Sequence, residues 1–128
     1  MTRILLADQH EEVLRALTSF LGEECGFTVV GTAREAASLL EAAGRDRPEV
    51  VLMEFGLPDR PAADLIKELH RLPSRPRVIA MSMRPEDSRL ALRAGADGFA
   101  SKTEGGDWAL DSLRRALGEE GSNEPKAQ

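Results

Sequence analysis

The chain has 128 residues, of which 41% are hydrophobic and 30% charged, and its formal net charge is −5. This length suits one globular domain that buries its core without disulfides. The negative charge argues against general nucleic-acid binding, which needs a cationic face. The single cysteine, Cys25, excludes an internal disulfide and fits a reducing compartment. No apolar run approaches the ~18 residues of a membrane span, and no signal peptide is recognisable, so we expect a cytoplasmic protein without membrane contact.

Short apolar runs alternate with helical patterns along the whole chain. The apolar runs predict five strands, at 4–7, 27–30, 50–53, 78–81 and 98–100. Apolar residues at helical spacing predict five helices, at 13–21, 36–43, 61–69, 85–94 and 110–117.

Several helix ends carry recognisable signals. Thr32 to Glu35 has the pattern of a capping box opening the second helix, and Gly44 suits the end of that helix. Pro61 suits the first turn of the third helix, because proline is tolerated there. Pro85 has the same place in the fourth helix, and Gly95 suits its end.

The strands are apolar at nearly every residue, which is typical of parallel strands covered on both faces. Alternating strands and helices with right-handed crossovers predict an α/β fold with a doubly wound parallel sheet. About five such units fit the flavodoxin-like (βα)5 fold with strand order 2-1-3-4-5. We expect residues 1–118 to form this domain and 119–128 to be a disordered tail or a linker stub, since the latter contains no large apolar residue.

Polar residues follow the strands at the edge where such sheets bind ligands. Asp8 and Gln9 follow the first strand, Glu54 ends the third, Ser82 follows the fourth and Lys102 the fifth. The predicted strand order brings these side chains together. Two carboxylates, Asp8 and Glu54, could hold Mg²⁺ weakly, and a lysine there could pair with a carboxylate or a phosphate.

A small flavodoxin-like enzyme or cofactor-binding domain is the alternative from a different functional class. No glycine-rich nucleotide loop follows the first strand. Asp8 and His10 begin a pattern of cobalamin-binding domains, but Val13 stands where that pattern needs glycine. His10 and His70 lack Cys or His companions at metal-binding spacing. We therefore expect no enzyme.

Four stretches together resemble the receiver domain of two-component response regulators, from about Arg3 to Leu117. They are "ILLADQH", "VVLMEFGLPD", "VIAMSM" and "GADGFASK". The resemblance is greatest to receivers that precede a helix-turn-helix output domain. It implies that Asp8 belongs to an Mg²⁺-binding acidic pocket and that Ser82 and Lys102 contact a phosphoryl group. It also implies that Phe99 is an aromatic switch and that Pro58 shapes the loop after the acceptor.

Two positions depart from the family pattern. Gln9 stands where a second acid is expected, and Glu54 stands where the family has its phosphoacceptor aspartate. Three hypotheses follow: Glu54 pairs with Lys102 and partially mimics the phosphorylated state, the site is inert and the domain is a docking module, or some Mg²⁺-dependent phosphotransfer survives. In the first two, conventional phosphorylation is lost.

The resemblance also implies partners for this signalling module. They are a histidine kinase or an output domain, with a homodimer possible through the face of the fourth helix, fifth strand and fifth helix. Trp108, near the start of the last helix, is expected to have a packing role.

Overall fold

The computed structural model describes residues 1–103 and 107–118, which form a parallel sheet covered by helices on both faces. The strands are β1 (Arg3–Ala7), β2 (Thr28–Ala33), β3 (Val50–Glu54), β4 (Arg77–Ser82) and β5 (Gly98–Ser101). The helices are α1 (Glu11–Thr18), continued by the π-helical segment η1 (Ser19–Glu24), α2 (Ala36–Asp46), α3 (Ala62–His70), α4 (Asp87–Arg93) and α5 (Trp108–Ala116). The strand order is β2-β1-β3-β4-β5, which confirms the predicted fold.

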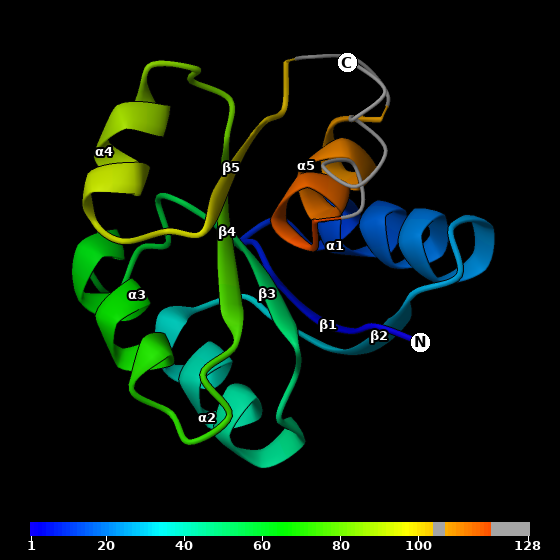
Figure 1. Ribbon diagram of the computed structural model, residues 1–128, viewed down its shortest axis with the longest axis horizontal. Coiled ribbons are helices and arrows are strands. Elements are labelled where there is room, and N and C mark those ends of the chain that lie inside the picture. Colours follow the sequence, from blue (N-terminus) through cyan, green and yellow to red (C-terminus); the bar gives the residue numbers. More distant parts are fainter. Residues whose placement is uncertain (104–106, 119–128) are drawn as a thin grey trace.

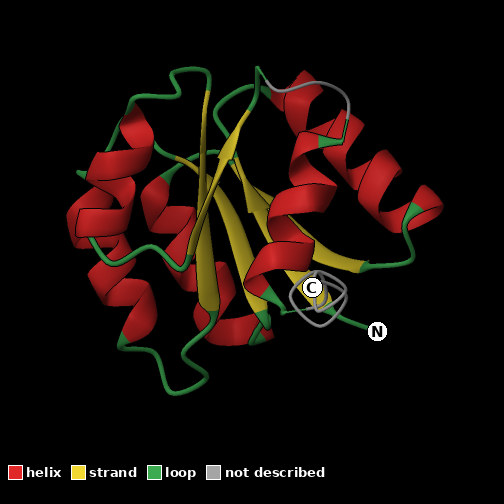
Figure 2. Ribbon diagram, turned by 45° about the horizontal axis from the view of Figure 1, so that its top comes forward, coloured by secondary structure: helices red, strands yellow, loops and turns green. Residues whose placement is uncertain are grey.

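The helices divide into two layers, one on each side of the sheet (Figures 1 and 2). Helices α2, α3 and α4 cover one face, while α1, η1 and α5 cover the other. From β1 the chain moves along the sheet to β2, and from β3 it moves the opposite way to β4. Because both crossovers are right-handed, they place their helices on opposite faces of the sheet. The switch of direction lies between β1 and β3, at their carboxyl ends.

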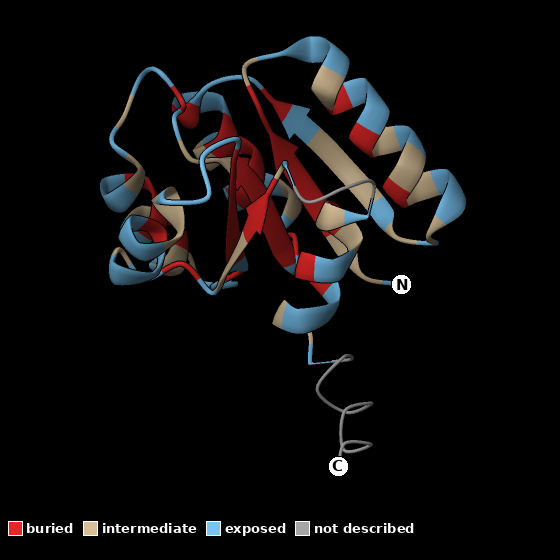
Figure 3. Ribbon diagram, turned by 90° about the horizontal axis from the view of Figure 1, so that it is seen from above, coloured by how far each residue is buried: buried red, intermediate tan, exposed pale blue. Residues whose placement is uncertain are grey.

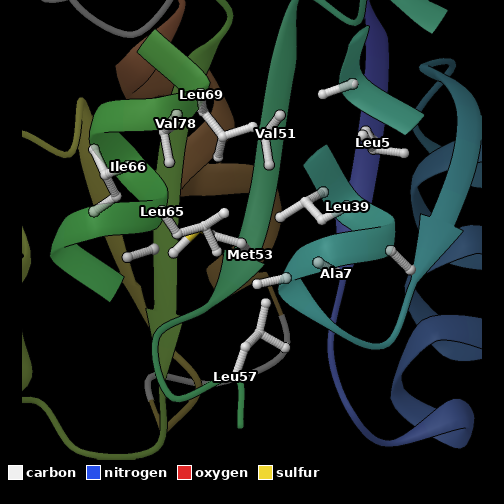
Figure 4. Packing of buried hydrophobic residues seen from close by; sticks show 14 of the residues in the cluster. Leu5, Ala7, Leu39, Val51, Met53, Leu57, Leu65, Ile66, Leu69 and Val78 are labelled. Atoms are coloured by element: carbon white, nitrogen blue, oxygen red, sulfur yellow. The ribbon is translucent and has the colours of Figure 1, made fainter. Parts of the chain in front are cut away.

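Strand β3 shows why the strand sequences lack alternation. Val51 and Met53 pack against the α2–α3–α4 layer, and Val50 and Leu52 pack against the α1–α5 layer. All four side chains are fully buried, as is most of the central sheet (Figure 3). Figure 4 shows the first layer, where Met53 lies toward the Leu57 end of the cluster. Burial on both faces requires apolar residues at successive positions.

The start of α2 differs from the prediction, because the expected capping box at Thr32 is wrong. Thr32 is an exposed residue of β2, whose pairing with β1 continues to Ala33. The helix is capped instead by Asp59 from the β3–α3 loop, whose carboxylate accepts hydrogen bonds from the backbone N–H groups of Ala36 (2.7 Å) and Ala37 (3.0 Å). A cap from a distant segment leaves no local sequence signal.

The end of α2 also differs, because Gly44 lies inside the helix. The helix continues to Asp46, and Arg47 takes the left-handed conformation that ends it, with φ 47°. The Arg3 guanidinium donates hydrogen bonds to the carbonyl oxygens of Asp46 and Arg47. These contacts satisfy carbonyl groups that the helix end leaves open, and they extend α2 past the glycine.

The remaining helix ends follow the sequence signals more closely. Pro61 is the N-cap of α3 rather than part of its first turn. Gly95 follows α4 with φ 102°, a conformation that favours glycine. None of the helices in the described ranges is long and apolar enough to cross a bilayer.

A polar junction joins three elements at the amino-terminal edge of β4. The Asp97 carboxylate accepts hydrogen bonds from the Val78 backbone N–H (2.8 Å) and from His70 Nε2 (2.8 Å). The Asp97 backbone N–H donates to the Val78 carbonyl at 2.7 Å. The junction therefore ties the end of α3, the start of β4 and the turn before β5 together.

Candidate functional site

The carboxyl ends of the central strands lie level with one another and carry the predicted site residues. In the sheet register, Ala7 is opposite Met53, Glu54 is opposite Met81, and Ser82 is opposite Ser101. Asp8 follows Ala7, and Lys102 follows Ser101. The edge of the sheet thus gathers residues that are up to 94 positions apart in the chain.

Asp8 and Lys102 form a buried ion pair. Lys102 Nζ lies 2.7 Å from Asp8 Oδ2, and the Asp8 side chain is fully buried while that of Lys102 is 11% exposed. Burial by itself raises the pKa of Asp8, but the hydrogen bonds and charge supplied by Lys102 and the hydrogen bonds of His10 outweigh it. The pKa of Asp8 is therefore held below its ordinary value, and Asp8 is an anion at neutral pH.

The other Asp8 oxygen fixes the turn into α1. Oδ1 accepts a hydrogen bond from the backbone N–H of His10 at 2.9 Å, which is an Asx turn. This turn brings the His10 ring back over the same carboxylate, with Nδ1 3.1 Å from Oδ1. His10 is the N-cap residue of α1, and its side chain is 58% exposed.

Glu54 is held by Gln9. The Gln9 backbone N–H donates to Glu54 Oε1 at 2.9 Å, and the Gln9 side-chain amide donates to Oε2 at 3.2 Å. The same amide reaches the carbonyl oxygen of Gly56 at 3.4 Å. Both carboxylate oxygens of Glu54 are therefore engaged by one residue, which bridges β1 and the loop after β3.

The expected pairing of Glu54 with Lys102 is not observed, because the Lys102 ammonium lies on Asp8. Asp8 is the fully buried carboxylate, so it gains most from a neutralising partner. Glu54 is only half-buried and has amide donors within reach. Glu54 and Lys102 share a site through Asp8 without touching each other.

Ser82 is turned toward α4. Its hydroxyl donates to Asp87 Oδ2 at 2.7 Å and accepts from the backbone N–H of Arg84 at 3.0 Å. Its carbonyl oxygen accepts from the Lys102 backbone N–H at 2.8 Å, which ties β4 to the end of β5. Ser82 lies at the predicted edge, but its hydroxyl organises the start of α4 in this structure.

Three further predicted residues lie around this edge. Phe99 is half-buried and packs against the α2–α3–α4 layer. Pro58 is exposed and lines a polar surface hollow with Gln9, Arg34 and Glu35. Trp108 is half-buried against the α1–α5 layer, so its expected packing role is confirmed.

Sequence reasoning missed two residues of the site. Arg34 donates through Nε and Nη2 to the Gln9 carbonyl oxygen, at 3.2 and 3.0 Å, and so holds the loop that positions Gln9. His10 has no Cys or His companion at metal-binding spacing, so this spacing does not point to it, yet its neighbours in the site are carboxylates. The signal available was the Asp-x-His spacing after a strand, since an Asx turn brings residues i and i+2 together.

A metal ion could be held on the surface side of the Asp8–Lys102 ion pair. One ligand atom each from Asp8, His10 and Glu54 lies within 4.8 Å of the others. Mg²⁺ is usually bound through one or two carboxylates and keeps several waters, so Asp8 and Glu54 meet its minimum. Beyond these two carboxylates the site offers Mg²⁺ no further acidic ligand, because Gln9 stands at the expected second acidic position and directs its side-chain amide at Glu54.

The fold and the sequence together identify the family. Residues 4–114 match the family described as response regulator receiver domain. The chain belongs to this family. The receiver fold also explains why the polar residues gather at the carboxyl edge of the sheet, which is where open α/β sheets bind ligands.

Two transcriptional regulators of Mycobacterium tuberculosis strain H37Rv illustrate the similarity. The transcriptional regulatory protein KdpE is 38% identical over 119 residues, which cover 91% of this chain and 51% of that protein. The DNA-binding transcriptional activator DevR/DosR is 33% identical over 104 residues, which cover 80% of this chain and 48% of that protein. The chain thus spans about half the length of these relatives.

Solved receiver structures share the architecture. The signal receiver domain of the putative response regulator NarL from Mycobacterium tuberculosis superposes with a TM-score of 0.80 at 25% identity, covering 91% of this chain and 97% of that one. A two-component response regulator of the LuxR family from Aurantimonas superposes with a TM-score of 0.82 at 22% identity, covering 91% and 86%. The second match concerns the fold alone.

Proposed function

We propose that this receiver domain is a signalling and protein-interaction module in which conventional aspartyl phosphorylation is lost. The observation that carries the proposal is the state of Glu54 at the acceptor position. Both of its carboxylate oxygens accept hydrogen bonds from Gln9, and its longer side chain replaces the expected aspartate. The second of these hydrogen bonds comes from the Gln9 side-chain amide, and an aspartate at position 9 has no such N–H group to donate.

Two physical effects reduce phosphoryl transfer at this site. Glutamate has one methylene more than aspartate, so its carboxylate reaches about 1.5 Å further along the side chain. Phosphoryl transfer needs in-line placement, and a misplacement of about 1 Å can cost roughly 100-fold in rate. The amide of Gln9 also removes a negative oxygen donor, which weakens Mg²⁺ binding at Asp8 and Glu54.

Of the two forms of lost phosphorylation, the contacts favour an inert acceptor over a mimic of the phosphorylated state. Mimicry would place the Lys102 ammonium on Glu54 and the Ser82 hydroxyl near it. Lys102 is on Asp8, and Ser82 is bonded to Asp87. A carboxylate also carries about one charge, against up to two for a phosphate, so mimicry would be partial even after rearrangement.

Incubation with acetyl phosphate and Mg²⁺, followed by intact-mass measurement, tests the proposal. We expect no phosphoryl adduct on the wild-type chain or on Gln9→Asp alone. We expect an adduct on the double variant Gln9→Asp/Glu54→Asp, because it restores both the acceptor geometry and the second acid. A wild-type adduct that peptide mapping places on Glu54 would show that phosphotransfer survives.

The proposed partners are a histidine kinase or an output domain, together with a second copy of the chain. The homodimer would form through the α4–β5–α5 face. Leu90 and Leu92 of α4 are more than half exposed, and so is Met83 in the loop before this helix. Exposed apolar side chains gathered in one region are typical of association surfaces.

A further inference from the structure

We propose that Asp8, His10 and Glu54 form a site for a nitrogen-preferring divalent transition-metal ion, with Zn²⁺ as the representative. His10 takes part through Nδ1, in addition to the two carboxylates. The inference concerns the metal that these residues select and does not rest on the loss of phosphorylation. It departs from the all-oxygen Mg²⁺ site because its third ligand is an imidazole.

The spacing of the donor atoms suits such an ion. His10 Nδ1 and Asp8 Oδ1 are 3.1 Å apart. Two ligands bound to one tetrahedral ion at about 2.1 Å each lie about 3.4 Å from each other. The third donor, from Glu54, lies within 4.8 Å of both. The gap that remains is small, and Glu54 is a half-buried side chain with rotatable bonds that can close it.

The two carboxylates are also oriented before any ion arrives, and only Glu54 has to shift toward the other donors. The Asx turn fixes the Asp8 carboxylate relative to the His10 backbone, and Lys102 holds the remaining Asp8 oxygen. Gln9 orients the Glu54 carboxylate from the other side. Outer partners of this kind orient metal ligands and are worth about 10–100-fold in affinity.

The charges favour a cation at this site. Asp8 and Glu54 contribute two negative charges and Lys102 one positive charge, so the site carries a net charge of about −1 before an ion binds. The Asp8 side chain is buried, and the His10 ring is largely exposed. The three donors therefore run from the core to the surface, and an ion can enter on the His10 side.

The donor set selects the metal. Without an ion, Nδ1 carries the hydrogen that it donates to the Asp8 carboxylate. A bound ion takes the place of this hydrogen, and the neutral imidazole then keeps its hydrogen on Nε2 and binds the ion through Nδ1. Imidazole is a preferred ligand of Zn²⁺, Ni²⁺ and Cu²⁺. Mg²⁺ takes oxygen ligands and gains nothing from it. A site with Gln9 in place of the expected second acid and with an imidazole at position 10 therefore favours Zn²⁺ over Mg²⁺.

Isothermal titration calorimetry of the whole chain with ZnCl₂ and with MgCl₂, in a non-coordinating buffer, tests this preference. We expect one Zn²⁺ per chain, bound more tightly than Mg²⁺. His10→Gln should weaken Zn²⁺ by at least about tenfold, since even the outer partners of ligands contribute that much, and should change Mg²⁺ binding little. Glu54→Gln should weaken both ions.

The chain provides its own control, because it contains two histidines. His70 lies at the Asp97 junction, at the opposite edge of the sheet. His70→Gln should leave Zn²⁺ affinity unchanged, and the NMR signals of the His10 imidazole should shift on Zn²⁺ addition while those of His70 stay in place. Circular dichroism checks that each variant is folded.

Three outcomes would overturn the proposal. They are Zn²⁺ affinity unaffected by His10→Gln in a folded protein, an unshifted His10 signal at saturating Zn²⁺, and Mg²⁺ bound more tightly than Zn²⁺. None of them bears on phosphorylation, which the acetyl phosphate experiment measures separately.

Discussion

At the scale of single residues, the site is organised around Asp8. This one buried carboxylate contacts the Lys102 ammonium through one oxygen and the His10 backbone and ring through the other. Its neighbours Gln9 and Glu54 form a second, separate pair. The Asp8–Lys102 ion pair therefore exists with glutamate at position 54. It gives a structural role to Asp8, expected in the acidic pocket, and to Lys102, expected to contact a phosphoryl group.

Replacing Lys102 should destabilise the fold, because the buried Asp8 carboxylate then has no cationic partner. We expect Lys102→Met to lower the free energy of unfolding by about 3 kcal/mol, because breaking a buried pair leaves an uncompensated charge. Urea denaturation at neutral pH measures the change. Adding Asp8→Asn to Lys102→Met should recover much of the loss, since no charge is then left unpaired.

Lys67→Met is the matched control, because Lys67 is an exposed lysine of α3. It should change stability by less than about 0.5 kcal/mol, as is usual for surface substitutions. Equal effects of the two lysine substitutions would show that the buried pair contributes no stability of its own.

At the scale of elements, Asp59 links the loop after β3 to the start of α2. The backbone N–H groups of Ala36 and Ala37 stabilise its charged form, so the pKa of Asp59 lies below its ordinary value. A carboxylate with a lowered folded pKa adds stability above its unfolded pKa of about 3.9, and this contribution is lost as pH falls through the folded value.

Asp59→Ala should therefore lower the melting temperature at pH 7, and the difference from wild type should disappear in strongly acidic solution. Thermal unfolding followed by circular dichroism measures both effects. A range from about pH 2 to about pH 7 brackets the ordinary carboxyl pKa of about 4. Glu41→Ala, which removes an exposed acid from the same helix, serves as the control. A difference that is the same at every pH would show that the Asp59 charge is not involved.

The elements themselves were largely predictable. Strands such as Val50 to Met53 are apolar because both of their faces are covered, and that pattern survives in the sequence. The start of α2 was not predictable, because its cap comes from Asp59, more than twenty residues away. Local motifs such as Thr32 to Glu35 compete with strand pairing, and here the pairing prevails.

The candidate site was predictable as a gathering of residues and not as a set of contacts. Topology alone brings Asp8, Glu54, Ser82 and Lys102 to one edge of the sheet. Which carboxylate receives the ammonium depends on relative burial and on side-chain conformations, which the sequence does not encode in any periodic pattern. His10 was missed for a related reason, since its partners are oxygen donors.

At the scale of the whole molecule, the exposed side of α4 is the surface on which we expect self-association. Leu90 is 55% exposed, although neighbouring Ala91 is fully buried. Replacing Leu90 by glutamate should lower self-association at high protein concentration and leave the fold unchanged, because the side chain projects from the core. Sedimentation velocity across a concentration series measures this change.

Ala63→Glu on α3 provides the control, because it adds the same charge at an exposed position of another helix. It should leave the sedimentation behaviour at high concentration as it is in wild type. A wild-type chain that stays monomeric throughout the series would remove the α4 surface as a dimer interface.

The Asp97 junction has a consequence for how the molecule opens. One carboxylate holds the last residue of α3 and the first buried amide of β4, at the edge of the sheet opposite Asp8. Separating α3 from β4 requires at least one of these two bonds to break, so the junction resists opening at this edge. Amide hydrogen exchange at Val78 should therefore be among the slowest in the chain.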